Sequence, residues 1–187
     1  LGVPNMKVHA KACLIKKRVN NKTIQYGFVS TGNLNEDTSN VYGDHCLLTA
    51  NRKVMADINR IFQFLENPLV SRLKFLRQCK TLIVCPTGMR GNFIKLIDHE
   101  IKNAVKKIPA SVTLKMNSLS DEQMIEKLYE AARAGVEVKL VIRGIFCMLT
   151  QNKKFAVQPT AISIVDQYLE HSRVLIFHNN GKPKVYL

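Results

Sequence analysis

The chain contains two similar stretches, Val8-His9-Ala10-Lys11-Ala12-Cys13-Leu14-Ile15 and Glu170-His171-Ser172-Arg173-Val174-Leu175-Ile176-Phe177. Each places a histidine two residues before a cation, at the start of an apolar run. Residues i and i+2 of a strand face the same side, so each strand would present an imidazole and a cation together. A neutral imidazole can attack phosphorus while a cation neutralises phosphate oxygens, which favours phosphoryl transfer. The alternative is a strand-edge histidine beside a solvated cation.

A polar turn follows the first stretch. After an expected strand at Tyr26–Ser30, the chain continues as Thr31-Gly32-Asn33-Leu34-Asn35. Glycine lets the backbone approach a ligand, and Asn33 and Asn35 supply amide donors without a competing charge, although such turns also serve as hairpin turns or helix caps. The order of these motifs resembles the phospholipase D superfamily pattern, His-x-Lys followed by Gly-Ser-x-Asn. Lys16 stands where that pattern has an aspartate.

Longer blocks, in the same order, are similar to the bacterial polyphosphate kinases of the larger, phospholipase-D-related type. The resemblance covers essentially the whole chain and rests on Val8–Lys11, Ser30–Glu36, Leu47–Ala50, Phe64–Pro68, Val141–Gly144, Ala161–Asp166 and Tyr168–His171. It implies an α/β fold of tandem phospholipase-D-like domains, with mixed or parallel sheets flanked by helices and both domains incomplete. It also implies reversible transfer of the terminal phosphate of ATP to polyphosphate through a phosphohistidine.

The same resemblance suggests roles for individual residues. It implies that His9 is the nucleophile, that His171 is a second essential histidine at the nucleotide, and that Tyr42 and Arg143 contact the nucleotide. Magnesium is expected to accompany ATP, and its protein ligands are unknown. The residues expected to bind phosphate are Lys11, Asn33, Asn35 and Arg173.

Purely structural roles are the alternatives for several of these side chains. A tyrosine at position 42 would also pack a loop against a sheet, and Arg143 would also form a surface ion pair. His45, His99 and His178 are interpreted as structural or exposed. One phosphoryl group needs both imidazoles, so we expect His9 and His171 to converge on one site, on the order of 5 to 8 Å apart.

The expected organisation is two domains. Residues 1–68 would form the C-terminal part of a first catalytic domain, residues 69–79 a linker, and residues 80–187 the N-terminal and central part of a second. Proline disfavours helical geometry just before itself, so a helix should end at Asn67-Pro68. Residue 1 is not methionine, and no second Gly-Asn turn follows an expected strand at Val185–Leu187, so we interpret the chain as an internal fragment.

The scaffold is predicted from hydrophobic spacing and capping residues. Apolar residues between Val54 and Leu65 fall on helical spacing, with Asn51 as the N-cap. A strand at Val112–Met116, a helix with a Ser120–Gln123 capping box and a Gly135 C-cap, and a strand at Val136–Ile142 together predict a parallel crossover. The other expected elements are a strand at Thr81–Val84 and a helix spanning Phe93–Val105.

The chain is strongly basic, with 28 lysines and arginines against 14 acidic residues and a net charge of +14. Such a surface attracts polyanions. Nucleic acid is the commonest partner of this kind, but aromatic residues make up only 7% of the chain and tryptophan is absent, which argues against base stacking. The resemblance favours ATP, ADP and polyphosphate instead. Many of the lysines are expected to be solvated surface charges.

Five cysteines without a Cys-x-x-Cys motif indicate a reducing compartment and no zinc site. No apolar run reaches the roughly 18 residues of a membrane span. We therefore expect a cytoplasmic protein, with peripheral membrane association left open, and a homo-oligomer at full length.

Two rival functions remain, a phosphodiesterase or phosphatidyltransferase of the wider superfamily and an inactive polyanion-binding fragment. Lys16 and Arg173 stand where the diester enzymes have other residues, which argues against the first rival.

Overall fold

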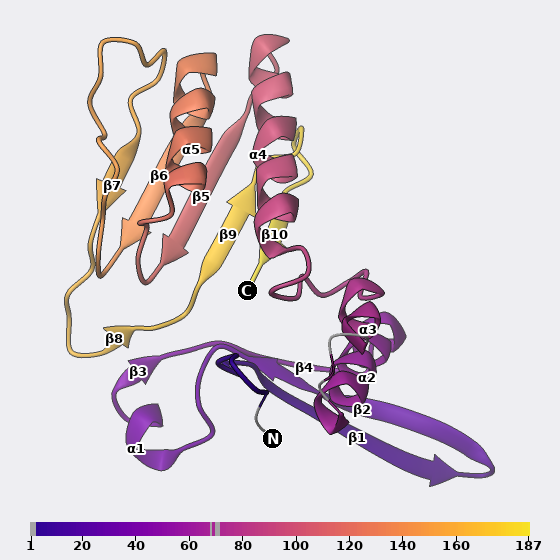
Figure 1. Cartoon of the computed structure of the whole chain (residues 1–187). Coiled ribbons are helices and arrows are strands. Elements are labelled where there is room, and N and C mark those ends of the chain that lie inside the picture. The colour runs from indigo at the N-terminus through magenta and orange to yellow at the C-terminus, as the bar shows by residue number, and fades with distance from the viewer. Residues whose placement is uncertain (1–2, 68, 70–71) are drawn as a thin grey trace. The chain divides into compact units, whose positions relative to one another are not determined.

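The computed structural model describes residues 3–67, 69 and 72–187, and its elements are drawn in Figure 1. The fold is mixed α/β, with both parallel and antiparallel sheets. The chain forms two compact units. Unit 1 comprises Leu1–Asn35 and His45–Met89, and unit 2 comprises Glu36–Asp44 and Arg90–Leu187. The short segment Glu36–Asp44 therefore belongs with the C-terminal half of the sequence.

Unit 1 is built on a three-stranded antiparallel sheet in the order β1-β2-β4. The strands are β1 (Lys11–Val19), β2 (Lys22–Ser30) and β4 (Cys46–Thr49). Helix α2 (Arg52–Glu66) buries Val54, Met55 and Ile58, against which Ala12, Leu14 and Val29 of the sheet pack. The predicted helix and its cap are confirmed, because the Asn51 side chain accepts hydrogen bonds from the backbone of Lys53 and Val54.

The prediction of a strand at Thr81–Val84 is wrong, since this segment is irregular. It follows helix α3 (Leu73–Arg77), which lies within the expected linker. The buried carboxylate of Asp57 explains the irregular segment. Its Oδ2 accepts hydrogen bonds from the backbone N–H groups of Lys80, Thr81 and Leu82 at 3.0, 2.7 and 3.0 Å. These donors are satisfied by a side chain and have no need of a neighbouring strand.

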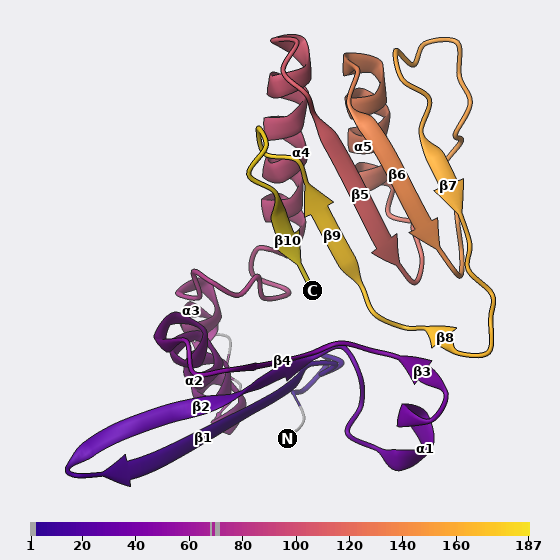
Figure 2. The same ribbon diagram turned by 180° about the vertical axis from the view of Figure 1, so that it is seen from behind.

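Unit 2 contains a five-stranded mixed sheet in the order β10-β9-β5-β6-β7. Strands β5 (Ser111–Met116), β6 (Glu137–Ile142) and β7 (Thr160–Ile162) are parallel, which confirms the predicted crossover. Strand β9 (Val174–Phe177) pairs antiparallel with β5, and β10 (Lys184–Tyr186) antiparallel with β9. Helices α4 (Met89–Val105) and α5 (Glu122–Ala134) lie on one face of this sheet, as Figures 1 and 2 show from opposite sides.

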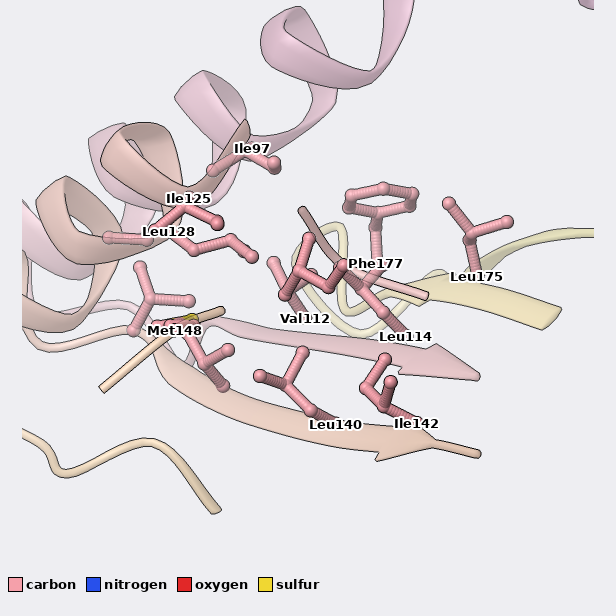
Figure 3. Packing of buried hydrophobic residues seen from close by; sticks show 14 residues of the cluster. Ile97, Val112, Leu114, Ile125, Leu128, Leu140, Ile142, Met148, Leu175 and Phe177 are labelled. Carbon is pink, nitrogen blue, oxygen red and sulfur yellow. The ribbon is translucent and has the colours of Figure 1, made fainter. Parts of the chain in front are cut away.

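The core of unit 2 lies between that face and the two helices (Figure 3). In β5, Val112 and Leu114 are buried, whereas Thr113 and Lys115 are half-buried on the opposite face. Leu128 from α5 and Phe177 from β9 complete the same cluster. The alternation in β5 thus places a lysine on the face that the helices leave uncovered.

The caps of α5 are partly as predicted. Gly135 ends the helix in the left-handed region at φ 94°, which confirms the C-cap. The Ser120–Gln123 capping box is wrong by one residue. Asp121 is the N-cap, and its Oδ1 accepts the N–H of Met124 at 3.0 Å. The backbone bond to Met124 and the Arg90 guanidinium hold the pKa of the Asp121 carboxyl below its usual value.

A small parallel sheet completes unit 2. It joins β3 (Tyr42–Gly43), which follows the short helix α1 (Glu36–Ser39), to β8 (Leu169–Glu170). In the register, Tyr42 lies opposite Leu169 and Gly43 opposite Glu170. This pairing brings residues 42–44 beside His171. Within the described part of the chain, every helix is too short or too polar to cross a lipid bilayer.

Candidate active site

Both histidine stretches open a β-hairpin. The first histidine hairpin runs from His9 through β1 and β2, and the second from His171 through β9 and β10. In each case the histidine lies before the strand, so the expectation that it occupies a strand face is wrong. The cation reaches back to it nevertheless. The ammonium of Lys11 donates to the His9 carbonyl oxygen at 3.4 Å, and Nη1 of Arg173 donates to that of His171 at 2.9 Å.

His9 is exposed and lies against an ammonium group. Nζ of Lys11 is 3.1 Å from Nε2 of His9 and 3.4 Å from Nδ1. An ammonium group only donates hydrogen bonds, so the ring nitrogen that it meets must offer a lone pair. The geometry therefore suits a neutral imidazole, which is the nucleophilic form.

The polar turn after β2 is held by the backbone around His45. The N–H of Thr31 donates to the His45 carbonyl oxygen at 3.0 Å, and the N–H of His45 donates to Oγ1 of Thr31 at 3.0 Å. Asn33 and Asn35 are exposed on this turn. Unit 1 thus contains the first histidine hairpin and both asparagines, which the sequence predicted to donate hydrogen bonds to phosphate.

His171 has a different environment, since its side chain is only 8% exposed. Nδ1 of its imidazole is 2.8 Å from Oδ1 of Asp44, and the Tyr42 ring lies tilted against it with 4.9 Å between ring centroids. An Nδ1–H donated to a carboxylate fixes the tautomer and leaves the lone pair on Nε2. The backbone N–H groups of His171 and Ser172 both donate to the Gly43 carbonyl oxygen, at 3.2 and 3.1 Å.

Lys115 holds the residues on either side of His171. Its Nζ is 2.9 Å from Oε2 of Glu170, 2.6 Å from Oγ of Ser172 and 3.0 Å from the Ser172 carbonyl oxygen. The lysine side chain is 18% exposed and the Glu170 side chain 34%. These three acceptors match the three donors of an ammonium group.

Arg143 directly follows β6, at the carboxyl end of a parallel strand. Among the side chains of the described residues, its Nε is one of the few buried polar atoms without a hydrogen-bond partner. A buried donor of this kind is costly unless an acceptor reaches it. The loop around it is tight, because a Cβ on Gly144 would lie 2.8 Å from the Asn117 carbonyl oxygen. Gly144 itself donates to that oxygen at 2.7 Å.

The remaining histidines and cysteines show no catalytic arrangement. Nδ1 of His178 accepts the N–H of Gly181 in the β9–β10 turn, while His45 and His99 are exposed. All five cysteines are free thiols, and burial raises the pKa of Cys79 to about 11, with the Asp57 charge adding to the effect. In the described residues no group of three or more His, Cys, Asp or Glu side chains could hold a metal ion. Magnesium that is bound together with nucleotide phosphates takes only one or two protein carboxylates, so it does not require such a group.

The structure brings together some of the predicted site residues. His9 contacts Lys11 in unit 1, and His171 contacts Tyr42 in unit 2. The convergence of His9 and His171 on one site stays a prediction, since they belong to different units. The sequence reasoning missed Asp44 and Lys115. Asp44 had one usable signal, its position two residues after Tyr42, whereas Lys115 had none because it meets Ser172 across 57 residues.

Comparison with known proteins agrees with the resemblance seen in the sequence. Residues 1–70 match the family model "Polyphosphate kinase C-terminal domain 1", and residues 82–187 match "Polyphosphate kinase C-terminal domain 2". The chain is 40% identical over 186 residues to the polyphosphate kinases of Escherichia coli K12 and Vibrio cholerae, covering 100% of this chain and 26% of each relative. It thus spans about a quarter of the length of these relatives.

A solved structure is also similar. The crystal structure of polyphosphate kinase from Porphyromonas gingivalis matches with a TM-score of 0.83 and 35% sequence identity, over 98% of this chain and 30% of that one. The second family model alone covers more than half of the chain. The chain therefore belongs to the polyphosphate kinase family, in the C-terminal part of that family's sequence.

Proposed function

We propose that the full-length protein carrying this chain is an ATP:polyphosphate phosphotransferase that works through a phosphohistidine at His9. The observation that carries the proposal is the Lys11 ammonium 3.1 Å from Nε2 of an exposed imidazole, in a member of this family. In the first step, a ring nitrogen of His9 attacks the γ-phosphorus of ATP, the N–P bond forms and the bond to the ADP oxygen breaks. In the second, a terminal polyphosphate oxygen attacks the same phosphorus and the N–P bond breaks.

The cations and amides serve the charge on the transferred group. Phosphoryl transfer has a loose transition state with charge on the equatorial oxygens, so catalysis consists largely of positioning and electrostatic stabilisation. Lys11 and Arg173 would neutralise phosphate oxygens, and Asn33 and Asn35 would donate hydrogen bonds to them. Because both steps move the same phosphoryl group, ATP and polyphosphate can use one cationic site in turn.

Three residues are proposed for the nucleotide. Arg143 has a buried Nε without a partner, and a phosphate oxygen is the acceptor that suits its planar charged fork. Tyr42 would stack on the adenine, and His171, oriented by the Asp44 carboxylate, would stabilise charge or carry a proton at Nε2. Magnesium is proposed as part of the MgATP substrate, held by phosphate oxygens, and no step is assigned to a protein-bound metal.

The proposed fold and setting follow the same assignment. Residues 1–68 and 80–187 would be parts of two phospholipase-D-like catalytic domains joined by residues 69–79. The full-length protein would be a cytoplasmic homo-oligomer, with ATP, ADP and polyphosphate as its partners. The net charge of +14 supports a polyanionic substrate.

The proposal is tested on the full-length protein with γ-labelled ATP and a polyphosphate primer. We expect acid-labile, base-stable label on the protein and ATP-dependent lengthening of the polymer, with lipid diesters and DNA left intact. Hydrolysis of a lipid or DNA diester without any ATP-dependent polymer would refute the proposal and indicate a phosphodiesterase. Polyphosphate binding without either reaction would leave a polyanion-binding protein.

A further inference from the structure

We propose that Lys115 is a positioning residue for His171, an inference that rests on the proposed function. Lys115 lies on β5, and its side chain is on the sheet face opposite to α4 and α5. Val112 and Leu114 of the same strand alternate with it and lie in the core. Its side chain extends to the segment 170–172, and its contacts are to Glu170 and Ser172 rather than to the imidazole between them.

The contacts leave this ammonium no donor for a substrate. Its three N–H groups are matched by Oε2 of Glu170, Oγ of Ser172 and the Ser172 carbonyl oxygen, at 2.9, 2.6 and 3.0 Å. Ser172 is 3% exposed, so its hydroxyl is also closed to solvent. A role in direct phosphate binding is therefore excluded for Lys115, unlike for Arg143 with its unpartnered Nε.

The position of the contacts determines what they do. The segment carrying His171 is held on one side by β3 and the residue after it, through the hydrogen bonds to Gly43 and the contact of the imidazole with Asp44. Lys115 holds the same segment from the five-stranded sheet, through the residues immediately before and after His171. Both holds lie within unit 2. Fixing residues 170 and 172 fixes the backbone of residue 171, and the contact of its imidazole with Asp44 then sets the direction of Nε2.

Charge gives Lys115 a second effect on the same histidine. The Glu170 carboxylate is adjacent to His171 and is neutralised by Lys115 at 2.9 Å. Without the lysine, an uncompensated negative charge would stand beside residue 171 and would disturb the contact between its imidazole and the Asp44 carboxylate. Both effects reach the substrate only through residue 171 and its neighbour, which distinguishes a positioning residue from a catalytic one.

The test is a double-mutant cycle in the full-length protein, read as the single-turnover rate of protein labelling from γ-labelled ATP. Lys115→Met should lower this rate about 10-fold to 100-fold, because small displacements of a reacting group cost factors of this size. In a His171→Ala background, the same change should lower the rate less than about 2-fold, because the group that it positions is gone. Lys139→Met is the matched control, since Lys139 lies on β6 and forms an exposed ion pair with Glu137. It should stay within about 2-fold of wild type.

An equal loss with and without His171, or no loss in the wild-type background, would overturn the role of Lys115. If Lys115→Met fails to fold, as judged by circular dichroism, Ser172→Ala replaces it under the same criteria, because this change removes the 2.6 Å contact of Lys115 with residue 172 and keeps the Glu170 charge neutralised. The outcome is separable from the proposed function. A wild-type protein that takes no label refutes the function itself, whereas a labelled wild type with an unaffected Lys115→Met variant refutes only this inference.

Discussion

The two histidine hairpins share a sequence pattern but hold their imidazoles in opposite ways. His9 is exposed and contacts the ammonium of Lys11, whereas His171 is 8% exposed and contacts the carboxylate of Asp44. In both, the cation two residues later donates to the histidine's own carbonyl oxygen. The repeat therefore specifies a local backbone geometry, and the chemistry is decided by what lies against the ring. A cation at a neutral ring favours a nucleophile, and a carboxylate favours an oriented donor or acceptor.

The largest expected effect comes from breaking the first histidine hairpin at Gly27. A Cβ at this position would lie 1.9 Å from the Cys13 carbonyl oxygen, which is backbone and cannot move aside. Gly27→Ala should lower the free energy of unfolding by more than about 3 kcal/mol, beyond the usual cost of overpacking. Urea denaturation of the full-length protein, followed by circular dichroism, measures it.

Gly91→Ala is the matched control for Gly27→Ala. Gly91 lies in α4, and nothing would approach its Cβ within 4 Å. This change should raise the free energy of unfolding by about 0.5 to 1 kcal/mol through helix propensity. Equal unfolding midpoints for the two variants would show that the hairpin does not depend on the close approach at Gly27.

The second histidine hairpin is broken chemically by Asp44→Ala. Loss of the carboxylate at 2.8 Å from Nδ1 frees the tautomer and orientation of His171, so the labelling rate should fall about 100-fold. Asp37→Ala, an exposed acid of the neighbouring helix α1, should change the rate less than about 2-fold. A rate for Asp44→Ala within 3-fold of wild type, a difference on the order of 0.7 kcal/mol, would show that the carboxylate does not orient His171 for the reaction.

The smallest expected difference concerns the two hairpin turns. Asn20 and Asn179 both have left-handed backbone geometry, at φ 47° in each case, which a residue such as alanine adopts at a cost of about 1 to 2 kcal/mol. The Asn179 side chain also donates to the Lys182 carbonyl oxygen at 2.8 Å. Asn179→Ala should therefore lower the free energy of unfolding by about 1 kcal/mol more than Asn20→Ala.

Urea denaturation checks this comparison, with Asn20→Gly as a control that removes the backbone cost. Asn20→Gly should keep most of the wild-type stability, because glycine adopts positive φ readily. A larger loss for Asn20→Ala than for Asn179→Ala would contradict the ranking of the two turns.

The sequence predicted those parts of the fold that depend on nearby residues. Asn51 caps α2 and Gly135 ends α5 through contacts within a few residues, and the sequence predicted both caps. The order strand, capped helix, strand also predicted the parallel pairing of β5 and β6. The role of Asp57 could not be predicted from the sequence, because its carboxylate binds the backbone of residues 80–82, more than twenty residues later. These hydrogen bonds take the place of the strand pairing that was expected there.

The candidate site was predicted in composition rather than in arrangement. The His-x-cation spacing identified both histidines, but it implied strand faces, and both residues lie before their strands. The partners of His171 come from distant sequence, since Asp44 is 127 residues away. Such contacts depend on the β3–β8 pairing, for which two-residue strands leave no periodic pattern to read.

Mapping the label along the sequence determines whether the exposed histidine of the first hairpin is the phosphoryl acceptor. The full-length protein is incubated with γ-labelled ATP, digested under alkaline conditions and analysed by mass spectrometry, beside His9→Ala and His178→Ala variants. We expect phosphohistidine on the peptide containing His9, its loss in His9→Ala and its retention in His178→Ala. Undiminished labelling of His9→Ala, or label mapped to His171, would contradict it.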